Sequence, residues 1–186
     1  QNESNMENIR SFAMTSIEKG LDGLLLTLWD DDSPHFELYM RGILAFAEYS
    51  WSGDQRSKEE IKAAYRHREF SNTLSGEEYA FVDQLEHSVA WWNSALLKRK
   101  GRNGLRKIAD PVEEGVIELP DRGEAGAWTN KHAQRLEKAT TVLRECDEVA
   151  LKIATMRSKS IRNQYRLEVY EQVNELVRFS ARSLLT

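Results

Sequence analysis

A short apolar run near the N-terminus, Leu24–Trp29 (LLLTLW), constrains the fold of this chain more than any other segment. Its residues do not alternate between apolar and polar, and Gly23 before it and Asp30 after it bound it sharply. Such runs are typical of a β-strand that is buried on both faces, as in a parallel sheet. A buried piece of helix is the alternative interpretation, and the shortness of the run disfavours it.

The segments on either side of this run have helical patterns. Residues 6–19 place Ile9, Phe12, Ala13 and Ile17 at helical spacing, which predicts an amphipathic helix that ends at Gly20. After the run, Ser33 and Pro34 are suited to the start of a helix over about 34–50. That second helix is apolar almost all the way round, so we expect other elements to cover it on more than one side.

The rest of the chain is predicted to be helical. Ser57 with Glu60 forms a capping-box pattern for a helix to about Phe70, and Ser75 with Glu78 repeats it for a helix to about Lys100. Residues 101–128 hold half of the ten glycines and two of the three prolines, which predicts a long irregular connection. From about Thr129 onward the pattern indicates two long helices, separated near Ser158–Ser160, and with the helix over 76–99 they could form a bundle.

Composition excludes several classes of protein. Of the 186 residues 40% are hydrophobic, so a sizeable core can form, and the net charge of −4 disfavours a globally basic nucleic-acid binder. The single cysteine, Cys146, rules out an intrachain disulfide and is interpreted as a small buried hydrophobe. No apolar run approaches the roughly 20 residues that span a bilayer. The chain begins at Gln1 without a signal-peptide pattern, which suggests a processed chain or a fragment and leaves the compartment open.

A lone strand is a physical problem, because each buried backbone group without a partner costs about 1–3 kcal/mol. No second segment offers a clear parallel partner for Leu24–Trp29, so we expect the chain to continue upstream into a parallel α/β structure. In such folds the loop after the carboxyl end of a strand carries the site. Here that loop begins Trp29-Asp30-Asp31-Asp32, and an aromatic ring followed by carboxylates suits the stacking and hydrogen bonding of a sugar.

At these residues the chain resembles glycoside hydrolase family 20, the β-N-acetylhexosaminidases. Gly23–Asp32 is similar to the family's eighth barrel strand with its following loop, and residues 34–51 are similar to the helix that closes the barrel. The resemblance covers roughly the first quarter of the chain, and the remainder is similar to a C-terminal helical extension that some members carry. The fold class expected is therefore mainly α, with one βα remnant of a (β/α)8 barrel over 1–52 followed by a helical bundle domain over 53–186.

The resemblance implies an exo-β-N-acetylhexosaminidase that removes terminal N-acetylhexosamine by substrate-assisted, retaining hydrolysis. Trp29 would form a wall of the sugar subsite and Asp31, at a position where the family often has Glu, would bind the outer hydroxyls of the sugar. The catalytic acid and its orienting aspartate lie near the family's fourth strand, so neither is expected in this chain, which alone should be inactive. The only adjacent Asp-Glu pair, Asp147-Glu148, is interpreted as part of a solvated helix face.

Other interpretations of the loop stay open. Three consecutive aspartates, Asp30–Asp32, could hold calcium, although their spacing is not that of a calcium loop, and we expect neither a metal nor a cofactor. Asp32 could instead stabilise the start of the following helix through its dipole, and Trp29 could simply pack at the mouth of the barrel.

Two other functions compete with the hexosaminidase hypothesis. The chain could be a non-catalytic helical module for interaction or oligomerisation, forming a homodimer through its C-terminal helices. It could also belong to another (β/α)8 sugar hydrolase. The partner expected under the main hypothesis is a carbohydrate, with no nucleic acid and no membrane.

Overall fold

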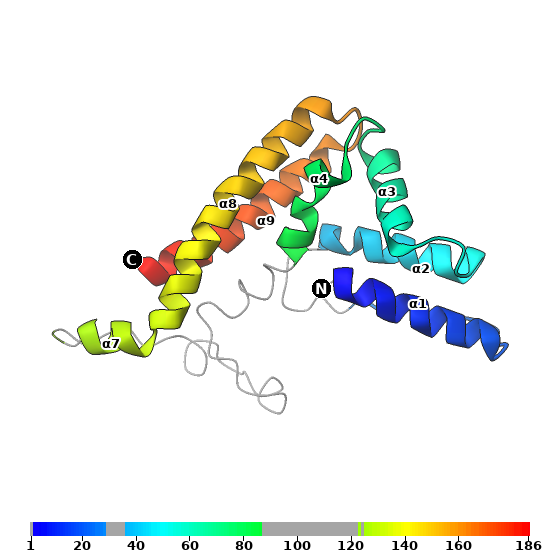
Figure 1. Cartoon of the computed structure of the whole chain (residues 1–186), viewed down its shortest axis with the longest axis horizontal. Helices are drawn as coiled ribbons and strands as arrows, with labels where there is room; N and C mark the ends of the chain where they lie inside the picture. Colours follow the sequence, from blue (N-terminus) through cyan, green and yellow to red (C-terminus); the bar gives the residue numbers. More distant parts are fainter. Residues whose placement is uncertain (1, 29–35, 87–122, 124) are drawn as a thin grey trace. The chain divides into compact units, whose positions relative to one another are not determined.

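The computed structural model describes residues 2–28, 36–86, 123 and 125–186 (Figure 1). Within these ranges the chain is helical and has no β-strand, which confirms the expected mainly-α class. The helices are α1 (Asn2–Glu18), η1 (Phe36–Tyr39), α2 (Met40–Ser52), α3 (Lys58–Glu69), α4 (Gly76–Tyr79), α7 (Ala125–Lys131), α8 (Ala133–Lys159) and α9 (Gln164–Leu185). Residues 81–86 are helical as well.

The chain divides into two compact units. The first comprises residues 1–87 and 150–173, and the second comprises residues 88–149 and 174–186. Both α8 and α9 contribute residues to each unit. The division at residue 52 that the sequence suggests stays a prediction.

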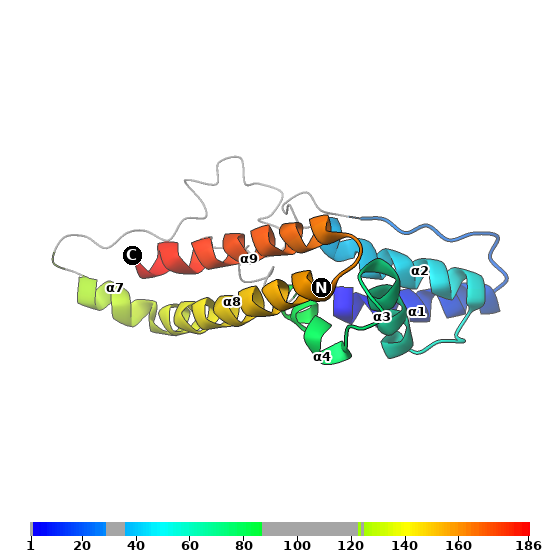
Figure 2. The ribbon, with the colours of Figure 1, turned by 90° about the horizontal axis from the view of Figure 1, so that it is seen from above.

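In the first unit α1 and α2 lie side by side and run in the same direction (Figures 1 and 2). Parallel helices cannot be joined by a short turn, because the chain must first return along the whole pair. Figure 2 shows residues 21–28 making this return. The 17 residues of α1 span about 26 Å, which an extended chain covers in about eight residues.

A small core joins these elements to α3. Its buried members are Met6, Ala13, Ala45, Tyr49 and Ile61. Leu24, from the returning segment, packs against this cluster. The segment is therefore fixed to the helices on one side.

The strand expected over Leu24–Trp29 is not formed by the described residues Leu24–Leu28, which carry neither helix nor β-ladder. Burial on both faces was also wrong, because Leu25 is 81% exposed. Leu24 and Leu26 are half-buried whereas Leu25 and Thr27 are exposed, which is the alternation of an extended chain with one face on a core. A β-ladder is absent because the described part of the chain offers no second extended segment to pair with it.

The two predicted capping boxes are present. Glu60 N donates to Ser57 Oγ at 3.3 Å and Ser57 N donates to the Glu60 carboxylate at 2.8 Å, and α3 then runs to Glu69 as expected. Ser75 and Glu78 make the same exchange. The single helix expected from there to Lys100 is wrong in part, because a turn at Ala80 separates α4 from residues 81–86. Residues 87–100 lie outside the described part.

The turn between α8 and α9 closes the carboxyl end of α3. Arg162 donates from Nη2 to the carbonyl of His67 at 2.7 Å and from Nε to that of Arg68 at 2.8 Å. Asn163, at a left-handed φ of 51°, donates to the carbonyl of Glu69 at 2.8 Å. The expected break near Ser158–Ser160 is confirmed, since α8 ends at Lys159.

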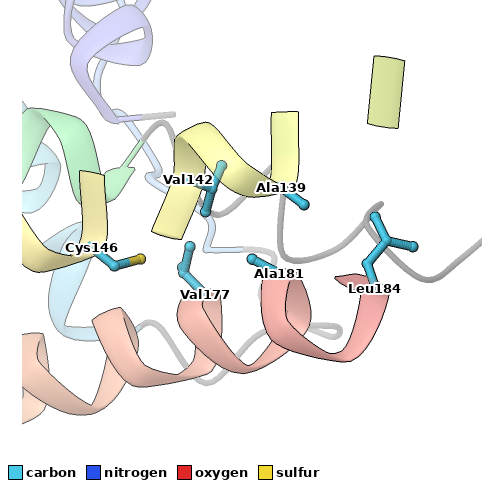
Figure 3. Close-up of a cluster of buried hydrophobic side chains, with 6 residues drawn as sticks. All are labelled: Ala139, Val142, Cys146, Val177, Ala181 and Leu184. Atoms are coloured by element: carbon cyan, nitrogen blue, oxygen red, sulfur yellow. The ribbon is translucent and has the colours of Figure 1, made fainter. Parts of the chain in front are cut away.

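In the second unit α8 and α9 form an antiparallel pair. Ala139, Val142 and Cys146 of α8 face Val177, Ala181 and Leu184 of α9 (Figure 3). Beside this cluster Asn174 Nδ2 donates to the carbonyl of Cys146 at 2.9 Å, so a buried amide is satisfied between the helices. Cys146 is buried, as expected.

The irregular connection predicted over 101–128 is partly wrong, because α7 begins at Ala125. Trp128 of α7 packs against the hydrophobic cluster between α8 and α9. This contact stabilises a short helix that contains a glycine. Residues 101–122 lie outside the described part. The packing of α8 and α9 against a third helix over 76–99 stays a prediction.

Candidate functional site

A groove of about 470 Å³ lies in the first unit between α1, the returning segment and α2. Its lining is mainly apolar, with few polar side chains. The lining residues are Asn5, Asn8, Ile9, Phe12, Leu25, Leu26, Thr27, Leu28, Tyr39, Gly42, Ile43 and Phe46. The predicted sugar-binding residues Trp29 and Asp31 follow directly in the chain, and they lie outside the described residues together with Asp30, Asp32, Ser33 and Pro34.

The returning segment presents both apolar surface and backbone polar groups. Leu25 and Phe12 of α1, which is 63% exposed, both line the groove. Leu24, Leu25, Leu26 and Leu28 make no hydrogen bond within the described ranges. An extended chain in which these leucines have no backbone hydrogen bond can receive another β-strand.

A charged cluster joins the start of α2 to α3 and to the helical residues 81–86. Arg41 donates from Nη2 to Glu86 Oε1 at 2.7 Å and also reaches Asp83, while Lys62 Nζ lies 2.9 Å from Asp83 Oδ2. Arg41 and Glu86 are each 2% exposed. The Arg41 guanidinium carbon also lies 5.9 Å from the centre of the Tyr79 ring.

Burial and pairing act on these groups in opposite directions. Burial raises the pKa of Glu86, and Arg41 only partly offsets that effect. Burial also acts to raise the pKa of Asp83, but Arg41 and Lys62 outweigh it and the pKa is lowered. Although burial disfavours the charged guanidinium, Glu86, Tyr79 and Asp83 raise the pKa of Arg41, which therefore stays charged. The cluster can join elements electrostatically.

Sequence reasoning missed this cluster. Helix α2 is otherwise apolar at its start, and a single arginine in such a stretch was the available signal. Charge alone could not show that Glu86, 45 residues away, would be its partner.

A second charged group joins η1 to α3 and α9. Arg166 of α9 lies 3.0 Å from Glu37 Oε2 and 2.6 Å from Glu69 Oε2, and it donates to Tyr65 Oη at 3.2 Å. Burial disfavours the charge of Arg166, but Tyr65, Glu69 and Glu37 outweigh that effect and raise its pKa. Glu37 belongs to the first described element after residues 29–35.

Other chemical features of the described residues do not form a catalytic centre. Asp147 and Glu148 are exposed on α8, and Asp147 pairs with Arg178, in agreement with a solvated helix face. Burial raises the pKa of the Cys146 thiol to about 11, the opposite of an activated nucleophile. The described ranges contain no cluster of three or more side chains suited to hold a metal ion.

Comparisons with known proteins add no relative. No protein-family model, curated protein or solved structure matches the chain. Among the described helices none has an apolar stretch that would cross a bilayer.

Proposed function

We propose that this chain is the C-terminal part of an exo-β-N-acetylhexosaminidase similar to glycoside hydrolase family 20. Trp29 and Asp31 would line its sugar subsite, on the resemblance of Gly23–Asp32 to the family's last barrel strand and loop. The observation that carries the proposal is the arrangement of α1, Leu24–Leu28 and α2. Two helices run in parallel, and an extended segment whose leucine backbones lack hydrogen bonds within the described ranges runs back from the end of α1 along the pair.

This arrangement supports one unit of a (β/α)8 barrel. In that fold each strand runs opposite to the helices around it, contacts them with one face and bonds to two neighbouring strands. Leu24 and Leu26 are half-buried, while Leu25 and Thr27 are exposed. In a barrel the exposed side would face the interior, and residues at the carboxyl end of the strand would face the substrate.

The chemistry assigned to the loop follows from its side chains. The indole of Trp29 would stack on the apolar face of the sugar, and Asp31 would accept hydrogen bonds from its outer hydroxyls. The acid that protonates the leaving oxygen and the aspartate that orients the acetamido group would come from other strands. This chain by itself would therefore show no turnover.

The test uses the protein that joins this chain to its barrel and an aryl N-acetyl-β-glucosaminide as substrate. We expect hydrolysis, with a loss of at least about tenfold in kcat/KM for Trp29→Ala and for Asp31→Asn, since each variant removes a direct sugar contact. Matched controls are Trp51→Ala, at a tryptophan that is 92% exposed, and Asp147→Asn on α8, which should change kcat/KM less than twofold. Turnover by the 186-residue chain alone, or an unaffected Trp29→Ala variant, contradicts the proposal.

A second candidate function is a helical oligomerisation module. The observation in its favour is that α9 exposes a large aromatic side chain, Phe179, which is 64% exposed in the second unit. A dimer through this face predicts that Phe179→Glu halves the mass measured by light scattering. A monomeric wild-type chain would exclude it.

A further inference from the structure

We propose that a small pocket between α2 and α3 binds a small organic monocarboxylate with an apolar body. The pocket has a volume of about 210 Å³, and its lining residues are Leu44, Glu48, Arg56, Ile61, Ala64 and Arg68. All six belong to the first unit. None of them belongs to the proposed sugar subsite, so the inference does not rest on the proposed function.

The helical period explains why these side chains meet. Leu44 and Glu48 are four residues apart on α2 and so lie on one face of that helix. Ala64 and Arg68 repeat this spacing on α3. Arg56 comes from the turn that joins the two helices. The pocket is therefore formed by one face of each helix and by the turn between them.

The apolar part of the lining is fixed by the core of the first unit. Ile61 of α3 is 2% exposed and belongs to the same buried cluster as Ala45 and Tyr49 of α2, which holds the two helices together. Leu44 and Ala64 are only half-buried. An apolar ligand group that covers these two side chains removes their surface from water, which favours binding.

The two arginines of the lining have hydrogen-bond donors that the protein does not use. Arg68 Nε donates to Glu69 Oε1 at 2.7 Å, and its two terminal nitrogens make no hydrogen bond within the described ranges. Arg56 Nη1 lies 3.6 Å from Glu48 Oε2, which is an ion pair but too long for a hydrogen bond. Both arginines are exposed, so an anion can reach them. A guanidinium group binds a carboxylate through two parallel hydrogen bonds.

Charge and volume narrow the class of ligand. Two arginines and one glutamate give the lining a net charge of +1, which suits a monoanion better than a dianion such as hydrogen phosphate. The volume is below the range of about 300–1,000 Å³ that is typical of pockets for drug-sized ligands, so the ligand is small. A branched aliphatic acid combines one carboxylate for the two arginines with an apolar group for Leu44 and Ala64.

The experiment titrates the protein with isocaproate, a branched aliphatic carboxylate, and follows binding by calorimetry. We expect one saturable site with a Kd of about 1 mM or lower. Arg56→Met and Arg68→Met should each raise the Kd at least about tenfold, because each removes charge-assisted hydrogen bonds to the carboxylate. The matched control is Arg144→Met, at an exposed arginine of α8 outside the pocket, which should change the Kd less than about twofold.

A fourth variant tests the apolar half of the site. Ala64→Leu places a larger side chain in the pocket and keeps all three charges of the lining, so we expect it to abolish saturable binding of isocaproate. Circular dichroism checks that each variant is folded. If Ala64→Leu does not fold, the two arginine variants decide the matter, since both change exposed side chains.

Two further probes define the chemistry of the ligand. Isocaproamide has the same shape without the charge and should bind at least about tenfold more weakly than isocaproate. Inorganic phosphate carries charge without an apolar body and should also bind more weakly. The proposal is overturned if isocaproate shows no saturable binding up to about 10 mM, or if the amide or phosphate binds as tightly. Equal effects of Arg144→Met and Arg68→Met overturn it as well, because binding would then not depend on the pocket.

Discussion

Arg41 Nη2 lies 2.7 Å from Glu86 Oε1, and the two side chains are almost completely buried. The pair joins the first turn of α2 to the helical residues 81–86. Buried ion pairs are weak evidence for net stability, because the loss of hydration opposes the attraction. Removal of one partner is nevertheless costly, since the remaining buried charge loses its hydrogen-bonded counter-charge.

Arg41→Met should therefore lower the free energy of unfolding by about 3–5 kcal/mol. The double variant Arg41→Met/Glu86→Leu should recover most of the loss, because it removes both buried charges of the pair together. Urea denaturation followed by circular dichroism measures both. The control is Arg10→Met, which breaks an exposed pair with Asp54 and should cost clearly less. A double variant no more stable than Arg41→Met would show that the buried charge of Glu86 does not cause the loss of stability.

Substitutions of Leu24 and Leu25 test whether the returning segment, residues 21–28, is buried on one face only. Leu24 packs against the α1–α2 core, so Leu24→Ala should cost about 1–2 kcal/mol of unfolding free energy. Leu25 is 81% exposed, so Leu25→Ala should change it by less than about 0.5 kcal/mol. Chemical denaturation of the two variants is the measurement. Equal losses would mean that the segment is covered on both faces, as the sequence first suggested.

The difference between Leu24 and Leu25 shows where sequence reasoning succeeded and where it did not. Helices α1, α3, α8 and α9 were predictable because periodicity, capping residues and glycine are local signals. The exposure of Leu25 was not predictable, since a run of leucines has the same sequence whether or not other segments of the chain cover it. The Arg41–Glu86 and Arg166–Glu37 contacts join residues 45 and 129 positions apart, a distance that no local pattern reports.

Replacing the serine of each capping box by alanine should affect the stability of the protein in different ways. Ser57→Ala removes the cap of α3, a helix of 12 residues, and should cost about 1 kcal/mol. Ser75→Ala acts on α4, which has four residues, but Glu78 of the same box also pairs with Lys159 of α8. We therefore expect Ser75→Ala to weaken that long-range contact as well. A double-mutant cycle with Lys159→Met measures the coupling, and additive losses would show that the cap and the ion pair are independent.

Stability should fall as the pH rises above about 8.5, partly because of Cys146. Burial raises the pKa of its thiol to about 11, whereas an unfolded thiol ionises near 8.5. Between these values the folded state keeps a proton that the unfolded state releases, so rising pH favours unfolding. Denaturation midpoints from pH 8 to 10.5 should therefore decline less steeply in Cys146→Ala than in the wild type. Parallel curves would show that the thiol does not contribute, since the buried tyrosines are common to both proteins.

Asn163 combines an unusual backbone with two hydrogen bonds, and two substitutions separate these effects. Its φ of 51° is in the left-handed region, and its amide donates to the carbonyl and the carboxylate of Glu69 at the end of α3. Asn163→Gly keeps the backbone conformation without strain but loses both bonds, so it should cost about 1 kcal/mol. Asn163→Ala loses the same bonds but keeps a Cβ at positive φ without the local hydrogen bonding of asparagine, so it should be about 1 kcal/mol less stable than Asn163→Gly. Thermal denaturation should rank the wild type above Asn163→Gly and Asn163→Gly above Asn163→Ala. If Asn163→Ala were the more stable variant, the left-handed turn between α8 and α9 would not be the conformation in solution.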